Sequence, residues 1–490
     1  MGALDRQSMD RVYEPLIKVR DDGSWGPRLA KSWEFDPDTT AWTFHLDERA
    51  TWHDGNPVTA DDVKFTYEKS YEYDFAPGGD SKPFVVSIDV VDEHTVRFIL
   101  TEPIADWPNL ASSVSIAPKH IWENIADIAT YQNPEPVGSG PFTWVEYDPL
   151  SHLLLAANKN YYLGAPAYDE LLLKLYANEE AALLALRAGE VDMTAVGVYT
   201  AIPTLLEIPE IAINIDRTAN RYSLLYLNHR FPPNDIKEFR HAVNLAIDRQ
   251  AIIDFALYGY GTWPRMCPFI PEVEANLAIE APAQDIAAAN AILDGLGYAK
   301  GADGIRVADG VRLEFELAIG TDPPSVRTGE IVRDNMEDIG IKLTLKAVEF
   351  GTMMGLIFSG EHFYDWGWAV LVHGAWVGFV GMAVEYAPVP YNPWFDAPSI
   401  GWGDDGAGGG TAEALALQAL IRQAMREPDP DVRYGLIQQV QAEFADQLPI
   451  IVTYRETMVS AYRTDRFEGW YMVLERALLS TPNLISLRPK

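Results

Sequence analysis

Residues 52–63 read Trp52-His53-Asp54-Gly55-Asn56-Pro57-Val58-Thr59-Ala60-Asp61-Asp62-Val63. The first half has the composition of a turn, because Asp, Gly, Asn and Pro each favour turn conformations. Thr59 is a good N-cap, and the acidic residues after it suit the first turn of a helix. Residues 42–46 and 96–100 on either side alternate apolar and polar side chains, which is typical of half-buried strands. The N-terminal third is therefore predicted to be β-rich, with a turn leading into a helix.

The middle of the chain changes to an alternation of strands and helices. A strand at residues 171–176 is followed by a helix from Glu179 to Ala188 that Gly189 closes. A strand at 313–317, a helix at 326–339 and a strand at 341–345 form one βαβ unit, which places two parallel strands in one sheet. Asp248 is expected to cap a short helix. Two further helices, from 411 and near 431–444, precede strands at 450–454 and 459–462. The fold class is α/β.

The charge excludes several classes of function. The 490 residues contain 71 acidic and 38 basic side chains, and the net charge is −33. Nucleic-acid binding needs clustered Lys and Arg, and an anionic membrane surface requires the same, so neither is expected. Cys267 is the only cysteine, which excludes an internal disulfide, a thiolate zinc site and an iron–sulfur cluster. We expect a buried thiol there, and we predict no metal and no cofactor.

The sequence lacks the signatures of the common enzyme classes. It has no His-x-x-x-His pair, no Gly-x-Ser-x-Gly elbow and no Walker A motif. It is rich in aromatic residues, with 14 Trp, 23 Tyr and 19 Phe, whose flat faces suit the capture of a ligand without chemistry on it. A binding protein is expected, and a hydrolytic enzyme is the minor alternative.

One uncharged stretch, residues 366–384, is long enough to cross a bilayer. Four glycines and His373 interrupt it, and acidic residues without a basic anchor flank it. We therefore expect a buried strand and turn there, not a transmembrane helix. The first six residues contain no apolar core of a signal peptide.

From Tyr13 onward the chain resembles the family 5 extracellular solute-binding proteins of ABC importers, the group of dipeptide-, oligopeptide- and nickel-binding proteins. Only twelve residues precede this match, so the chain looks truncated or trimmed. Asp47 and Glu48 stand where the family usually has a basic pair. The matching stretches are residues 13–16, 29–33, 42–46, 52–63, 117–121, 136–142, 186–192, 227–228, 239–243 and 246–249.

The resemblance implies the fold of a type II periplasmic binding protein, with two mixed α/β lobes, a hinge and an additional β-rich inserted domain. Lobe I is expected to combine residues 1–19, 143–262 and 463–490, the inserted domain to span 20–142, and lobe II to span 263–462. It also implies a monomer outside the cytoplasm, in the periplasm or at the cell surface. This monomer would capture a small molecule or peptide between the lobes and deliver it to the permease subunits of an ABC transporter.

The ligand is left open between a peptide and other solutes. Peptide-binding members usually anchor the α-amino group of the ligand on an Asp in the stretch that corresponds to residues 368–376, and this stretch has no carboxylate. An unpaired buried ammonium is costly, so an oligosaccharide, an opine-like compound or a metal chelate is the alternative. The candidate ligand-binding residues are aromatic residues for stacking or packing, one amide for hydrogen bonding and one backbone loop. They are Trp366, Trp368, Trp376, Tyr391, Trp394, Asn228, Gly138, Ser139 and Gly140.

Overall fold

The computed structural model describes most of the chain. The described residues are 9, 11–19, 25–73, 78–104, 107–217, 222–229, 231–267, 277–349, 352–353, 368–372, 411–427, 429–470 and 481–490. Their buried apolar side chains form two hydrophobic cores, which define two bodies. The first body has its core within residues 12–155 and at Leu484 and Leu487. The second body has its core within residues 183–461.

The first body contains four sheets and several helices. Its largest sheet has the strand order β3-β4-β6-β5, with all neighbours antiparallel, and α2 packs beside it. The helices are α2 (Ala60–Tyr73), η1 (Gly79–Phe84), α3 (Trp107–Ser113), α4 (Lys119–Trp122) and α15 (Thr481–Ser486). The strands are β1 (Ile17–Val19), β2 (Trp25–Pro27), β3 (Ala30–Asp36), β4 (Ala41–Leu46), β5 (Val85–Asp92), β6 (Thr95–Leu100), β7 (Phe142–Asp148), β8 (His152–Ala157), β9 (Glu170–Lys174), β22 (Phe467–Glu468) and β23 (Arg488–Pro489).

The second body is built on a six-stranded mixed sheet of order β13-β20-β12-β19-β17-β18. Its strands are β12 (Tyr222–Leu227), β13 (Gly261–Thr262), β17 (Glu314–Ile319), β18 (Lys342–Ala347), β19 (Trp368–Val372) and β20 (Ile451–Glu456). A smaller sheet contains β10 (Met193–Ala195), β11 (Ile211–Asp216) and β21 (Met458–Arg463), and a third contains β14 (Ala299–Lys300), β15 (Arg306–Ala308) and β16 (Val311–Arg312). Thr457 alone separates β20 from β21, so the chain passes directly from the six-stranded sheet into the sheet of β10, β11 and β21.

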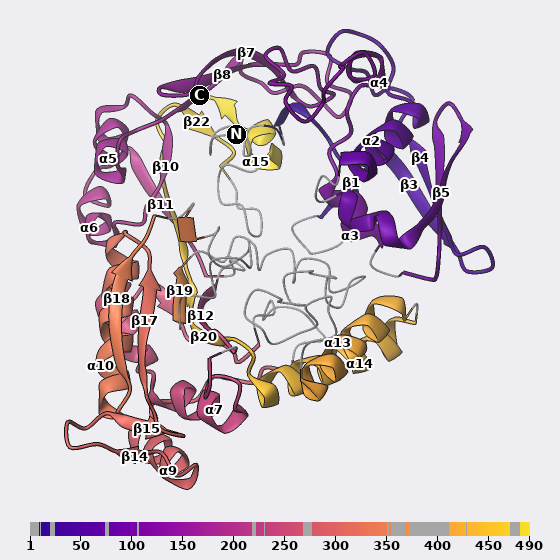
Figure 1. The fold of residues 1–490 in the computed structure, drawn as a ribbon. Coiled ribbons are helices and arrows are strands. Elements are labelled where there is room, and N and C mark those ends of the chain that lie inside the picture. The colour runs from indigo at the N-terminus through magenta and orange to yellow at the C-terminus, as the bar shows by residue number, and fades with distance from the viewer. Residues whose placement is uncertain are drawn as a thin grey trace.

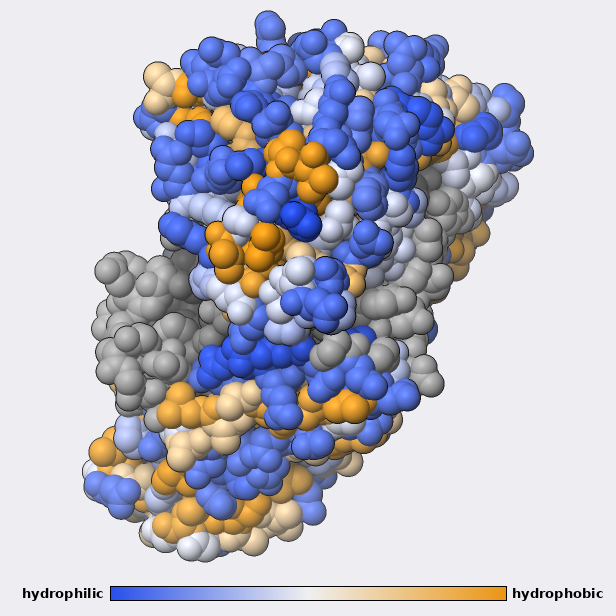
Figure 2. Space-filling model, turned by 90° about the vertical axis from the view of Figure 1, so that its right-hand side faces the viewer, coloured by the Kyte–Doolittle hydropathy of each residue, from blue (hydrophilic) through white to orange (hydrophobic). Residues whose placement is uncertain are grey.

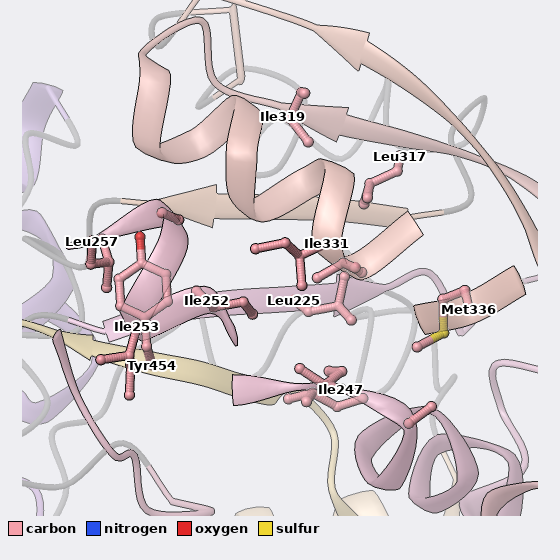
Figure 3. Packing of buried hydrophobic residues seen from close by; sticks show 14 of the residues in the cluster. Leu225, Ile247, Ile252, Ile253, Leu257, Leu317, Ile319, Ile331, Met336 and Tyr454 are labelled. Carbon is pink, nitrogen blue, oxygen red and sulfur yellow. The ribbon is translucent and has the colours of Figure 1, made fainter. Parts of the chain in front are cut away.

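Helices cover one face of the six-stranded sheet. Leu225, Leu317 and Tyr454 from the strands pack against Ile252 and Ile331 from the helices (Figure 3). The helices of this body are α5 (Glu179–Ala188), η2 (Tyr199–Ala201), α6 (Ile202–Leu205), α7 (Lys237–Ala246), α8 (Arg249–Ala251), η3 (Ile252–Ala256), α9 (Ile286–Gly295), α10 (Pro323–Asp338), α13 (Ala412–Arg426) and α14 (Pro430–Gln447). The apolar faces of α5, α6, α7, η3, α9 and α10 supply the second half of the core, and its burial is the main stabilising term of this body.

Figure 1 shows the two bodies arranged around a central region. They are joined on one side where the chain passes from β9 to α5 and from β21 to β22. On the opposite side the paired helices α13 and α14 extend toward the first body. Two ion pairs lie on the joined side, between Arg466 and Asp192 at 3.1 Å and between Lys174 and Glu190 at 3.9 Å.

Most of the predicted elements are present. The βαβ unit is formed by β17, α10 and the parallel strand β18, and Gly189 closes α5 with a left-handed φ of 74°. Helix α2 begins after Thr59 as expected, and Asp248 Oδ1 accepts a hydrogen bond from Ala251 N at 2.9 Å. Cys267 is buried, and this burial raises the pKa of its thiol.

The two cores divide the chain differently from the predicted domains. Residues within 20–142 share one core with Leu16, Leu153 and Leu484. Strand β12, assigned to lobe I by the predicted boundary at 262, pairs with β19 and β20 of the predicted lobe II. Hydrophobic packing thus crosses both boundaries, and the residue bounds given for the lobes and the inserted domain stay a prediction.

The uncharged stretch at 366–384 is described only at residues 368–372. These residues form β19, which pairs antiparallel with β12 and parallel with β17. Among the described residues, no helix combines the length and the apolar character that a membrane crossing requires.

Candidate functional site

The stretch at 52–63 holds a turn of the chain that lies far from it in sequence. Gly138 N donates to His53 Nδ1 at 3.2 Å, and His53 Nε2 lies 3.0 Å from the carbonyl oxygen of Gly140. Because a carbonyl oxygen can only accept, Nε2 carries the proton and Nδ1 is the acceptor. Burial lowers the pKa of His53, which favours the neutral ring that this arrangement requires.

The same stretch also joins helix α2 to the segment at 117–121. The Asp62 Oδ2 atom accepts from Thr59 N at 2.8 Å and from Thr59 Oγ1 at 2.9 Å. Its Oδ1 atom accepts from Lys119 N at 2.8 Å, and Thr66 Oγ1 accepts from Ala117 N at 3.0 Å. Two of the motifs that carry the family resemblance are therefore parts of one structural junction.

The predicted backbone loop at 138–140 packs against the segment at 11–16. Gly140 N donates to Val12 O at 2.8 Å, and a Cβ atom on Gly138 would lie only 1.9 Å from that same oxygen. Ser139 is fully buried, and its hydroxyl donates to Glu14 Oε2 at 3.1 Å. Glycine is thus required here by the close approach of two backbones. A ligand contact by the loop stays a prediction.

Glu14 lies at the centre of this junction. Tyr161 Oη donates to its Oε1 atom at 2.6 Å, and Ser139 donates to its other oxygen. Burial raises the pKa of Glu14 despite these two hydrogen bonds. The carboxyl group thus connects the N-terminal segment, the glycine loop and the residue that follows strand β8.

The structure brings two other predicted residues, Asn228 and Trp368, into one buried network. Asn234 Nδ2 donates to Asn228 O at 2.9 Å, and Trp368 Nε1 donates to Asn234 Oδ1 at 3.1 Å. The Trp368 ring is fully buried and stacks on Phe315 with 5.2 Å between ring centroids. These surroundings fit a packing role for Trp368. The sequence allowed this role as well as stacking on a ligand. Asn234 was missed because its partner lies 134 positions away.

The remaining aromatic candidates lie outside the described residues. They are Trp366, Trp376, Tyr391 and Trp394. Among the described residues, no group of three His, Cys, Asp or Glu side chains is arranged to hold a metal ion.

The second face of the six-stranded sheet carries residues that the sequence analysis did not select. Leu225 and Leu227 of β12 belong to the core under the helices, so the alternating Tyr222, Leu224 and Tyr226 lie on the opposite face. Arg455 of β20 lies opposite Tyr222 in the register and is 6% exposed. The apolar run at 224–227 of β12 signals burial on both faces, but it does not distinguish a core face from a face toward a ligand.

Residues 24–386 match the model of the middle region of bacterial extracellular solute-binding proteins, family 5. The chain belongs to this family. Family 5 proteins are binding proteins and not enzymes, and their family name places them outside the cytoplasm.

Two curated relatives show how far the similarity extends. A Brucella ovis protein, named provisionally as an ABC transporter peptide-binding protein, is 31% identical over 301 residues. The match covers 59% of this chain and 55% of the relative, so the chain spans about half the length of that relative. Di/tripeptide-binding protein 2 of Pseudomonas aeruginosa is 23% identical over 468 residues, which cover 89% of this chain and 82% of that protein.

Solved structures share the fold over the full chain. The oligopeptide-binding protein AppA from Bacillus subtilis, in complex with a nonapeptide, has a TM-score of 0.83 and 22% identity, and the match covers 100% of this chain and 95% of AppA. NikZ from Campylobacter jejuni, in complex with Ni(L-His), has a TM-score of 0.81 and 20% identity, with 98% and 94% coverage. The fold of this protein is therefore the two-lobed, mixed α/β fold of family 5 binding proteins.

Proposed function

We propose that this protein is the substrate-binding component of an ABC import system, and that it captures a peptide between its two lobes and delivers it to the permease subunits. The family match over residues 24–386 carries this proposal. A relative that is 31% identical is named for peptide binding, which supports the peptide as the ligand class. We infer a monomer in the periplasm or at the cell surface.

The two bodies of the structure suit a protein in which one body moves relative to the other. Each body has its own apolar core, and the predicted residues Gly138, Ser139 and Asn228 lie in buried hydrogen-bond networks within one body each. Ligand contacts with both bodies would stabilise the closed arrangement over the open one, because a ligand shifts an equilibrium by its differential affinity for the two states.

We propose that the ligand contacts the second face of the six-stranded sheet. Tyr222 and Tyr226 offer aromatic faces with a polar tip, and Arg455 brings a cation to the same face. A peptide needs these partners, since its side chains are partly apolar while its backbone and terminal carboxylate are polar. The stacking roles of Trp366, Trp376, Tyr391 and Trp394 remain part of this proposal.

A thermal-shift screen tests the ligand class. Purified protein is melted with di- and tripeptides, longer peptides, nickel–histidine and oligosaccharides. A ligand at 100 times its Kd adds about 2.7 kcal/mol to the free energy of unfolding, which raises the Tm. We expect peptides to raise it and mass spectrometry to recover them unchanged. A Tm that responds only to another solute, or a hit that is converted, would contradict the proposal.

A variant pair then tests the proposed face. Tyr226 is 8% exposed on that face, and Tyr226→Phe removes only its hydroxyl. Tyr67→Phe is the matched control, because the Tyr67 hydroxyl is buried without a hydrogen-bond partner in the first body. We expect Tyr226→Phe to weaken binding of a peptide hit and Tyr67→Phe to leave it unchanged. Equal affinities would exclude a hydrogen bond between the Tyr226 hydroxyl and the ligand.

A solute without an ammonium group is the second candidate. Residues 368–376 contain no carboxylate, which removes the usual partner of a peptide α-amino group. NikZ, which has this fold, was solved with Ni(L-His). The nickel–histidine arm of the screen separates this candidate from the first.

A further inference from the structure

One ion pair connects the two bodies on the side opposite the chain crossings. Arg426 Nη2 lies 2.6 Å from Glu102 Oε1. Arg426 is the last residue of α13, and Glu102 follows strand β6 of the four-stranded sheet. The two residues are 324 positions apart in the sequence, so only the tertiary arrangement brings them together.

Each partner is fixed to its own body. Helix α14, which packs along α13, is attached to the second body because Arg240 of α7 donates to Gln447 O at 2.6 Å and Lys237 pairs with Asp446 at 2.7 Å. Glu102 is held near the first body because Thr101 N donates to Phe84 O at 2.9 Å. The pair therefore reports on the distance between the bodies and not on a local turn.

The surroundings of this pair are polar and open to water. The Arg426 side chain is 47% exposed and that of Glu102 is 32% exposed. Figure 2 views this side of the molecule, and a band of hydrophilic residues crosses its middle between the upper and lower parts. Exposed ion pairs are weak and are screened by salt. A weak contact between two bodies can break and form again as the bodies move.

We propose that Glu102 and Arg426 form an electrostatic latch that biases the ligand-free protein toward the closed arrangement. The joined side, with its chain crossings and the Arg466–Asp192 pair, acts as the pivot, and the latch closes the far side. Its weakness is functional, because a strong contact would hold the protein closed without a ligand. The latch acts on the motion of the two bodies, and its action does not depend on which solute the protein binds.

Distances between spin labels in the ligand-free protein test the latch. Val91 of β5 and Val432 of α14 are 54% and 51% exposed and lie in different bodies. Both are replaced by Cys and labelled, with the buried Cys267 replaced by Ala. Pulsed electron paramagnetic resonance then gives the populations of short and long distances. We expect Arg426→Glu or Glu102→Arg to raise the long-to-short ratio about 1.4- to fivefold, which is the range for loss of an exposed pair.

A variant with both charges reversed and a measurement at high salt complete the test of the latch. The double variant E102R/R426E restores the pair with reversed charges, so we expect it to return the ratio toward the wild-type value. At 1 M NaCl, where the Debye length is about 3 Å, the wild type should shift toward the single variants. Arg426→Glu should shift in the opposite direction, because salt screens the repulsion between its two carboxylates. Arg312→Glu is the matched control, since Arg312 pairs with Asp303 and Glu314 inside the second body and should change nothing.

One set of results would overturn the latch. Distance distributions that are the same in the wild type, both single variants and high salt mean that the pair does not bias the arrangement. Thermal melts check that each variant is folded. If a charge-reversal variant does not fold, Arg426→Gln or Glu102→Gln takes its place. Because no ligand is added, this outcome is independent of whether the protein binds a peptide.

Discussion

The indole Nε1 of Trp368 donates a hydrogen bond to Asn234 Oδ1 at 3.1 Å inside the core of the second body. Trp368 lies on the central strand β19, and its ring is packed between Phe315 at 5.2 Å and Phe239 at 6.4 Å. Asn234 Nδ2 in turn donates to the carbonyl oxygen of Asn228, which directly follows strand β12. One tryptophan therefore joins the sheet to the turn that leads into α7.

Replacing Trp368 by Ala is expected to destabilise the protein by about 3–5 kcal/mol, because it leaves a large cavity in the core. Trp368→Phe keeps an aromatic ring but leaves the Asn234 acceptor without its donor, at a cost of about 1–3 kcal/mol. Urea unfolding followed by circular dichroism measures both. A Trp368→Ala variant with wild-type stability and weakened ligand binding would instead assign the residue to the ligand site.

Arg249 is expected to be one of the most sensitive polar positions. Its guanidinium is 1% exposed and donates to Val452 O at 3.0 and 3.1 Å, to Asn244 O at 3.1 Å and to Pro282 O at 3.2 Å. Burial lowers its pKa to about 9. Arg249→Ala leaves these buried acceptors unpaired and should cost at least about 3 kcal/mol.

Lysine is not expected to rescue this site, because its single ammonium cannot reproduce the planar fork of arginine. Arg333→Ala is the control. Arg333 lies on α10 with a side chain that is 42% exposed, so its loss should change the free energy of unfolding by no more than about 0.5 kcal/mol. Similar losses in the two alanine variants would contradict a structural role for Arg249.

The buried His53 ring is expected to make the folded protein less stable in acid. Burial lowers its folded pKa below the usual 6.5, so between these two values the unfolded chain binds more protons than the folded one. The free energy of unfolding should therefore fall as the pH drops below about 6.5. Protonated Nδ1 also cannot accept from Gly138 N.

His53→Gln tests this origin. A Gln amide keeps one acceptor and one donor but does not titrate, so the slope of stability between pH 6.5 and 5 should decrease. His120 lies nearby and contacts Asp54 at 2.7 Å, so His120→Gln is the matched control substitution. A slope that His53→Gln leaves unchanged would show that other groups cause it.

Asp62 and Asp61 offer a matched pair on the first turn of α2. Asp62 is 4% exposed and accepts three hydrogen bonds, from Thr59 and Lys119. Asp61 has only an exposed contact with Lys119 Nζ at 3.4 Å. Asp62→Ala should cost about 2–3 kcal/mol, and Asp61→Ala about 0–1 kcal/mol. Thermal melts at pH 7 compare them, and equal losses would contradict the capping role.

The sequence alone determined the local structure of this protein. Thr59, Asp248 and Gly189 begin or end helices through hydrogen bonds and dihedral angles within a few residues, so residue type at one position decides the outcome. The βαβ unit at 314–347 could also be predicted from the sequence, because short connections join its two strands and its helix. The resemblance of residues 13–249 also gave the family.

Only the tertiary structure decided the partners that are distant in sequence. The residue type of Trp368 fits stacking on a ligand as well as packing, and its position against Phe315 and Asn234 assigns the contact. His53 meets Gly138 across 85 positions, and Arg426 meets Glu102 across two bodies. Such pairs depend on how whole sheets and helices are placed, and no spacing in the sequence encodes that placement. The physical reason is that side-chain chemistry sets which contacts are favourable, while packing of the two cores sets which residues can meet.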